Sequence, residues 1–170
     1  RALRAIDVES CALFNLAFRV ASRWRKVVWP RHQEDVERVG RDVWLRVGVT
    51  KNGTPRMKWV HPDARWALAY LPFEHGDRYY YDRFCAARAA VGLPGGRDVP
   101  GGLTAHDMRH VVATDIRKRG GSLSDVGSAL DHDSYAASQR YAQITPAQVK
   151  RGLAGVGRKM HTSGAGRRRK

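Results

Sequence analysis

Cysteine is scarce in this chain, which has only Cys11 and Cys85 among its 170 residues. Two isolated cysteines cannot build a disulfide framework, and a structural zinc site needs clustered Cys and His ligands. Such sparse use of cysteine is typical of the reducing cytoplasm. We therefore expect no disulfide, no metal centre and no cofactor.

Long apolar runs are also missing from the sequence. None approaches the ~18 residues that a membrane helix requires, and the chain does not open with the pattern of a signal peptide. We expect a soluble, cytoplasmic protein with no membrane partner. A chain of 170 residues suits one domain with a substantial core, since domains typically hold ~100–150 residues.

Acidic residues are few, 16 against 31 Lys and Arg, which gives a net charge of +15 and a pI near 10.7. The tail GRRRK (166–170) supplies only four of the positive charges, so the body of the chain is basic as well. A surplus of this size attracts polyanions through counterion release. It favours a protein that binds double-stranded DNA and associates with the nucleoid. The alternatives are a ribosomal protein or an ordinary enzyme with a basic tail.

The first third of the chain predicts helix and then a hairpin. Apolar residues recur every three or four positions over 2–29, and Pro30 ends that stretch. The segment 41–49 alternates as a strand, Asn52-Gly53 is a strong turn, and 55–60 is the returning strand. The residues expected on one face of the first strand are Val43, Leu45, Val47 and Val49.

The rest of the chain predicts further helices separated by polar loops. Expected helices run from His61 to Leu71, from Asp77, and from the capping residues Thr104, Ser122 and Thr145, with a loop at 93–102. The architecture is thus a mainly α domain with a small antiparallel hairpin or three-stranded sheet. It covers residues 1–156, and we expect the glycine-rich, basic tail 157–170 to be disordered.

Four residues between 103 and 141 suggest a reaction. His106 and Arg109 are three positions apart and share one helix face; His132 follows Arg109 by 23 residues, and Tyr141 follows His132 by 9. Met108, Val111 and Val112 are expected on the opposite, core-facing side of that helix. The order suits attack on a phosphodiester by a tyrosine hydroxyl, because the other three groups can all donate to a phosphate.

The two central roles follow from side-chain chemistry. A tyrosine hydroxyl with pKa ~10 is a weak nucleophile until its proton is removed or nearby cations stabilise the phenolate. The planar guanidinium of Arg109 can hold a phosphate with two parallel hydrogen bonds, which a lysine cannot copy. Tyr141 is therefore the candidate nucleophile and Arg109 the candidate phosphate clamp. A structural histidine remains the alternative for both His106 and His132.

This pattern resembles the tyrosine recombinases (phage-integrase family), whose catalytic domains carry an H-x-x-R helix, an L-G-H turn and a downstream tyrosine. The matching segments are HDMRH (106–110), LDH (130–132) and Tyr141, and RVGVTKNGTPRMKWV (46–60) resembles the family's hairpin with its catalytic Lys51. The resemblance spans roughly residues 13 to 150 and implies the catalytic-domain fold.

The resemblance implies further roles. His106 would donate to the phosphate or exchange a proton with the tyrosine, His132 would bind a non-bridging oxygen, and Lys51 would protonate the leaving 5′-oxygen, with Lys58 as a fallback. A first arginine is expected ahead of the hairpin, followed three positions later by an acidic residue. We assign it to Arg19, although Ser22 stands in the acidic position; Arg23 and Arg25 remain alternatives.

The sequence departs from the family's pattern at a second position. Asp131 stands where the family usually has glycine. A carboxylate beside a phosphate site should weaken anion binding unless it points away or pairs with a neighbour such as Arg140.

The function implied is site-specific recombination or integration through a 3′-phosphotyrosine, without metal or ATP, by a tetramer of protomers on two DNA sites. The chain begins with Arg1, so an N-terminal DNA-clamping domain is expected to lie outside it. The segment 145–153 predicts a helix that docks either on a neighbouring protomer or on its own core.

Three other functions are compatible with parts of the pattern. A type IB topoisomerase would use the same tyrosine chemistry, although those enzymes usually carry a lysine at the position of His106. A degenerate integrase domain would bind DNA without cutting it, which Asp131 and the uncertain first arginine leave open. A metal phosphohydrolase of the HD type would need more His and Asp ligands than His106-Asp107 and Asp131-His132 supply.

Overall fold

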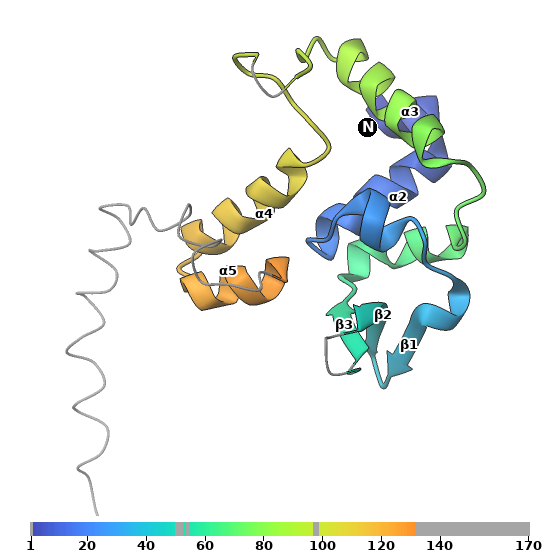
Figure 1. Cartoon of the computed structure of the whole chain (residues 1–170), viewed down its shortest axis with the longest axis vertical. Helices are drawn as coiled ribbons and strands as arrows, with labels where there is room; N and C mark the ends of the chain where they lie inside the picture. Colours follow the sequence, from blue (N-terminus) through green and yellow to red (C-terminus); the bar gives the residue numbers. More distant parts are fainter. Residues whose placement is uncertain (1, 50–52, 54, 97–98, 132–170) are drawn as a thin grey trace, which may run out of the picture.

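The computed structural model describes residues 2–49, 53, 55–96 and 99–131. The described part is mostly helical with one three-stranded antiparallel sheet, which confirms the predicted fold class. Figure 1 shows the sheet grouped with α2 and α3, while α4 and α5 lie together to one side. Within the described residues, no helix is both long and apolar enough to cross a membrane.

The helix predicted over 2–29 is broken in two places. Helix α1 spans Ala2–Ile6 and α2 spans Val8–Arg19; Asp7 separates them and caps α2 by accepting a 2.8 Å hydrogen bond from the amide of Ser10. The chain then leaves the helix through Ala21, whose φ is +54°, and the amide of Ser22 donates back to the carbonyl of Ala17 at 3.0 Å. This is a Schellman ending, in which glycine is the usual left-handed residue.

The chain resumes after this turn as a short π-helical segment, Trp24–Val28. The prediction of one continuous helix was therefore wrong. The apolar spacing continues through the break, but the backbone does not, because the left-handed conformation of Ala21 redirects the chain.

The sheet has the order β1-β2-β3, with β1 at Val36–Val39, β2 at Asp42–Val49 and β3 at Pro55–Trp59. Strands β2 and β3 match the predicted hairpin, and β1 adds the third strand. The predicted face of β2 is right for Val43, Leu45 and Val47, which are buried, and wrong for Val49, which is 63% exposed. The β2–β3 register shifts between Arg46 and Gly48, so Val49 lies beyond the irregularity, at the end of the sheet opposite Pro55.

The main core lies among α2, the sheet, the 3-10 helix Pro62–Tyr70 and helix α3, Asp77–Ala90. Phe14 is central to it, with ring centroids 5.1 Å from Trp24 and 5.0 Å from Phe84. Tyr80 is fully buried and donates its hydroxyl to Glu9 at 2.7 Å. Burial, together with this hydrogen bond, raises the pKa of Tyr80, so this tyrosine has a structural role.

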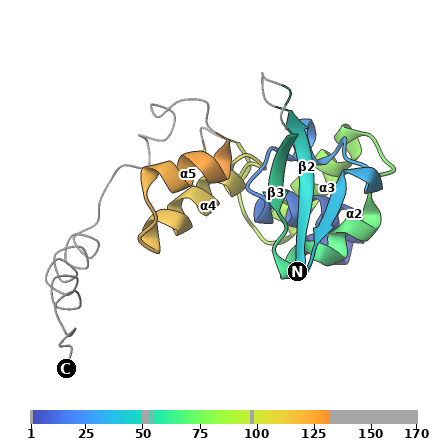
Figure 2. The same cartoon turned by 90° about the horizontal axis from the view of Figure 1, so that it is seen from below.

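Helices α4, Asp107–Lys118, and α5, Leu123–Leu130, form a second, smaller body beside the sheet (Figure 2). Its Ala113, Val126 and Leu130 form a second apolar cluster together with Ala21, from the turn after α2. The predicted capping box of Ser122 and Asp125 is present at the start of α5. Helix α4 begins at Asp107, later than the predicted start at Thr104, although the predicted pairing is present: the amide and hydroxyl of Thr104 both donate to the Asp107 carboxylate, at 2.7 and 2.6 Å.

Candidate functional site

Arg109 is held by two hydrogen bonds to carbonyls of distant segments. It lies in the first turn of α4 and is only 9% exposed. Its Nη1 donates to the carbonyl of Ala21 at 2.8 Å, and its Nη2 donates to the carbonyl of Leu130 at 2.6 Å. Leu130 is the last residue of α5, where the carbonyls lack donors within the helix, and Ala21 lies two residues beyond the end of α2. The guanidinium is therefore fixed between three helices.

A small cavity of about 150 Å³ lies against Arg109. It is lined by Arg23, Val27, Val47, Arg56, Arg109, Leu130 and Asp131. Three of these side chains are arginines from separate elements: Arg23 from the turn after α2, Arg56 from β3 and Arg109 from α4. Arginines that line one cavity are suited to binding a phosphate or another oxyanion.

Asp131 is the acidic member of this cavity, and Lys58 pairs with it. The Lys58 Nζ lies 2.7 Å from Asp131 Oδ1 and also donates to the carbonyls of Ala129 and Ser128, at 2.8 and 3.2 Å. Lys58 is 8% exposed. Burial lowers the pKa of its ammonium, while the hydrogen bond to Asp131 opposes that change. The expected neighbour of Asp131, Arg140, lies outside the described residues.

His106 is the residue immediately before α4 and is exposed. Its ring packs edge-on against His110, with centroids 5.1 Å apart. The hydrogen bond from the Thr104 hydroxyl holds the pKa of the Asp107 carboxyl below its usual value. Two imidazoles and a carboxylate thus lie at the amino end of α4, where the helix dipole favours negative charge.

The inward face of α4 differs from the predicted one. Arg109 and Ala113 are buried, whereas Val111 is 52% exposed. Met108 and Val112 do pack against the two apolar clusters. The prediction was wrong for Val111 because the hydrogen bonds of Arg109 and the small side chain of Ala113 turn their own side of the helix toward α2 and α5.

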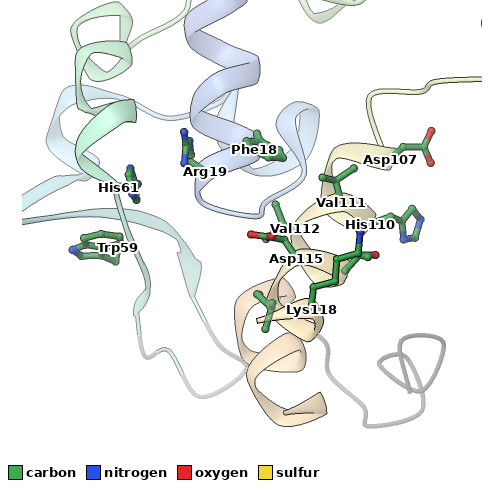
Figure 3. A pocket seen from close by; sticks show the side chains of 12 residues that line it. Phe18, Arg19, Trp59, His61, Asp107, His110, Val111, Val112, Asp115 and Lys118 are labelled. Atoms are coloured by element: carbon green, nitrogen blue, oxygen red, sulfur yellow. The ribbon is translucent and has the colours of Figure 1, made fainter. Parts of the chain in front are cut away.

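Arg19 lies elsewhere. It is the last residue of α2, and its Nη2 forms an ion pair with Asp63 at 3.3 Å. It lines a larger, open cavity of about 520 Å³, together with Trp59, His61 and residues of α4. Figure 3 shows Arg19 and Phe18 across this space from His110 and Asp115. The structure therefore brings Arg23, one of the predicted alternatives, to the cavity of Arg109, while Arg19 does not line that cavity.

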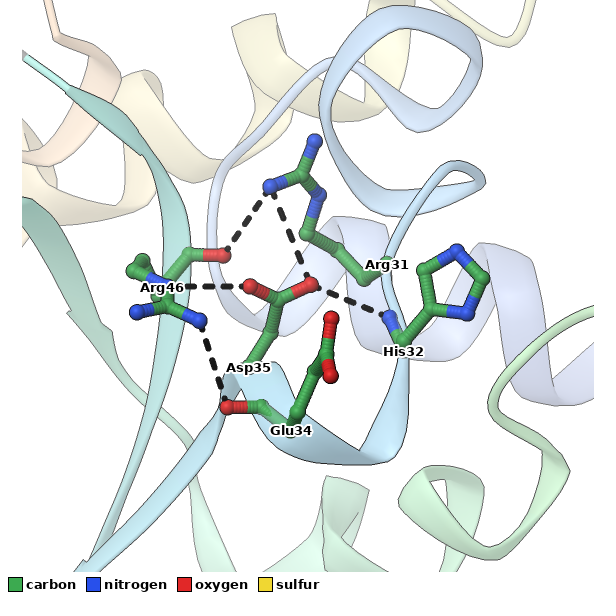
Figure 4. Close-up of polar contacts among 5 residues, drawn as sticks. All are labelled: Arg31, His32, Glu34, Asp35 and Arg46. Atoms are coloured by element: carbon green, nitrogen blue, oxygen red, sulfur yellow. Dashed lines mark hydrogen bonds and ion pairs between the residues drawn. The ribbon is translucent and has the colours of Figure 1, made fainter.

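A polar cluster fixes the strand behind the smaller cavity (Figure 4). Oδ1 of Asp35 accepts from Arg46 Nε at 3.0 Å; Oδ2 accepts from the amide of His32 at 3.1 Å and lies 3.9 Å from Arg31 Nη1. Burial raises the pKa of Asp35, but these donors outweigh it, and the net pKa is lowered. Arg46 adjoins Val47 in the cavity wall, so the cluster holds the irregular stretch of β2 in place.

Three predicted catalytic residues, Lys51, His132 and Tyr141, lie outside the described residues. The described part contains no group of three or more His, Cys, Asp or Glu side chains that could hold a metal ion. Sequence reasoning missed Arg56 as a lining residue. Its signal was its place on the returning strand of the hairpin, opposite Gly48.

Comparison with known proteins supports the fold. No family model and no curated protein matches the sequence. The site-specific recombinase XerH, in a pre-cleavage complex with its difH substrate, matches with a TM-score of 0.65 and 16% identity; the match covers 92% of this chain and 51% of XerH. The catalytic domain of bacteriophage HP1 integrase matches with a TM-score of 0.58 and 16% identity, over 94% of both chains.

The integrase of the Tn1549 transposon, in complex with circular intermediate DNA, matches with a TM-score of 0.64 and 15% identity, over 89% of this chain and 61% of its own. The chain thus spans about half the length of XerH and nearly all of the HP1 catalytic domain. The predicted resemblance is confirmed at the level of the fold, which is that of a tyrosine recombinase catalytic domain.

Proposed function

We propose that this chain is the catalytic domain of a site-specific tyrosine recombinase or integrase that acts on double-stranded DNA. The observation that carries the proposal is the cavity where Arg23, Arg56 and Arg109 converge, in a fold shared with proteins that recombine DNA. The net charge of +15 supports a polyanionic substrate. As XerH and the Tn1549 integrase are bound to DNA, we infer the same class of partner here.

The proposed reaction is a transesterification in which one P–O bond replaces another. The hydroxyl of Tyr141 attacks the scissile phosphorus, the bond to the 5′-oxygen breaks, and the products are a 3′-phosphotyrosine and a free 5′-hydroxyl. Arg109 holds the phosphate, since its hydrogen bonds to Ala21 and Leu130 orient the guanidinium before DNA arrives. Reversal of the same step rejoins the strand without an external energy source.

The remaining proposed roles are distributed around this phosphate. His106 and His132 donate to its oxygens or exchange a proton with Tyr141, and Lys51 protonates the leaving 5′-oxygen. We assign the first arginine to Arg23 instead of Arg19, because Arg23 lines the cavity of Arg109 and Arg19 is paired with Asp63. Assembly as a tetramer on two DNA sites belongs to the same proposal.

A covalent-trapping assay tests it. Wild-type protein and Tyr141→Phe are mixed in EDTA with nicked DNA fragments from the genetic element that encodes the gene, and are then denatured in SDS. We expect a protein–DNA adduct from the wild type and none from Tyr141→Phe, with similar DNA affinity for both. Tyr81→Phe is the matched control, because Tyr81 is 38% exposed on α3. Adducts that persist in Tyr141→Phe would refute the assignment of the nucleophile.

A second candidate function is DNA binding without cleavage, and the place of Asp131 in the cavity favours it. In that case the wild type would bind DNA but form no adduct, either alone or as the full-length protein. A type IB topoisomerase activity would give adducts together with relaxation of supercoils, but no strand exchange between two duplexes.

A further inference from the structure

The carboxyl end of α5 is capped by two cations that come from different elements. Lys58, on β3, donates to the carbonyls of Ser128 and Ala129, and Arg109, on α4, donates to the next carbonyl, that of Leu130. The last carbonyls of a helix lack donors of their own and carry the negative end of the helix dipole. The two cations therefore hold this helix end against both the sheet and α4.

The residue that follows is held by the same lysine. Asp131 adopts φ +51° and ψ +48°, a left-handed conformation that glycine adopts at no steric cost. Asp131 lines the cavity together with three arginines, and an unpaired carboxylate there would oppose an incoming phosphate. Instead it forms an ion pair of 2.7 Å with Lys58, and the two side chains are 28% and 10% exposed.

We propose that Lys58 and Asp131 form a positioning pair that takes the place of a glycine turn at the phosphate site. Lys58 neutralises the Asp131 carboxylate and ties the end of α5 to β3. The pair thereby sets the position of the Leu130 carbonyl that orients Arg109. This inference rests on the proposed function. It adds two positioning residues, which act by holding Arg109 in place.

The geometry assigns Lys58 this role and not that of the proton donor to the leaving group. An ammonium has three donor hydrogens. The Nζ of Lys58 already has three acceptors within 3.2 Å: two carbonyls and a carboxylate. To protonate a leaving oxygen, it would have to give up one of these partners inside a buried setting.

A double-mutant cycle tests the pair in the full-length protein. The variants are Lys58→Met, Asp131→Gly and the two together, and the measured quantity is the rate of adduct formation at saturating nicked DNA. We expect Lys58→Met to slow the wild-type reaction by about tenfold, an interaction of the size seen between contacting residues. In the Asp131→Gly background the same change should cost about threefold or less, because glycine takes the left-handed turn without a carboxylate that needs a partner.

Equal effects of Lys58→Met in both backgrounds would overturn the inference. DNA affinity, measured in parallel, separates positioning from phosphate binding, since the pair should act on the rate at saturation and change the dissociation constant far less. If Lys58→Met fails to fold, Lys58→Gln, which keeps donors for the two carbonyls, carries the same cycle.

A second measurement distinguishes positioning from proton donation. In a substrate whose leaving 5′-oxygen is replaced by sulfur, the leaving thiolate needs no proton, because a thiol has a pKa of ~8.5. The defect of Lys58→Met should be the same with both substrates. If the sulfur-containing substrate abolished the defect of Lys58→Met, Lys58 would be the proton donor and the inference would be wrong. The wild-type reaction reports on the proposed function separately: without a wild-type adduct, that function itself fails.

Discussion

Replacing Arg109 by lysine should weaken both the fold and the chemistry, because the two terminal nitrogens of the guanidinium bind carbonyls in different parts of the chain. Nη1 reaches Ala21 at 2.8 Å and Nη2 reaches Leu130 at 2.6 Å. A lysine keeps the charge but cannot place its single nitrogen at the positions of both Nη1 and Nη2, so at least one of these two short hydrogen bonds is lost. A hydrogen bond to a charged group contributes about 1.5–3 kcal/mol, and we expect Arg109→Lys to lower the free energy of unfolding by about that amount.

The effect on catalysis should be larger than the effect on stability. Lysine lacks the planar pair of donors that matches a phosphate. Loss of one oriented donor at a transition state costs about 10²–10³ in rate. DNA affinity should change little, since the positive charge is retained. Urea unfolding gives the stability, adduct formation at saturating nicked DNA gives the rate, and a salt titration of binding gives the affinity.

Arg119→Lys is the matched control for this experiment. Arg119 follows α4 directly, and its side chain is 79% exposed and paired with Asp115 at 2.8 Å. An exposed pair of this kind contributes about 0–1 kcal/mol, so the control should behave like the wild type in all three assays. If Arg109→Lys also matched the wild type in stability and in cleavage, Arg109 would be neither the link between helix ends nor the phosphate clamp.

Three further predictions follow from single contacts. Arg23→Gln should reduce adduct formation by at least about tenfold while Arg19→Gln has a smaller effect, since only Arg23 lines the cavity of Arg109; the reverse order would restore Arg19 as the first arginine. Because the folded-state pKa of Asp107 lies below its ordinary 3.8, its stabilisation is present above that pH and is lost as the pH falls further. The stability gap between wild type and Asp107→Asn should therefore narrow in acid, and a gap in urea unfolding that is constant with pH would contradict this. Asp7→Ala removes the cap of α2 and should cost about 1 kcal/mol in the same unfolding assay; no loss would mean that the cap is not a stabilising contact.

Local patterns in the sequence predicted the parts of the fold that depend on near neighbours. Ser122 and Asp125 form the predicted capping box, and the alternation of β2 places Val43 and Leu45 in the core. Such features depend on residues two to four positions apart. The helix around Arg109 was predictable for the same reason, although its inward face was not, because hydrogen bonds to distant carbonyls rotate that face toward α2 and α5.

The arrangement of the site depends on contacts that no local pattern encodes. The positive φ of Ala21 breaks the helix predicted over 2–29, yet an alanine side chain gives no sign of a left-handed backbone. The choice between Arg19 and Arg23 depends on that break, since the change of direction separates the two side chains into different cavities. The pairing of Lys58 with Asp131 joins β3 to the end of α5, and a sequence read one segment at a time shows only a charge on each.

The balance of charge explains why this site needs more than one arginine. The carbonyls that orient Arg109 come from the ends of α2 and α5, and a helix end of this polarity repels an anion. Arg109 and Lys58 offset the end of α5, and Lys58 also offsets Asp131. Arg23 and Arg56 line the same cavity and add to the attraction that Arg109 exerts on a phosphate. Removing Arg23 or Arg56 should therefore weaken phosphate binding, whereas changes at Arg109 should act mainly on the orientation of the bound phosphate.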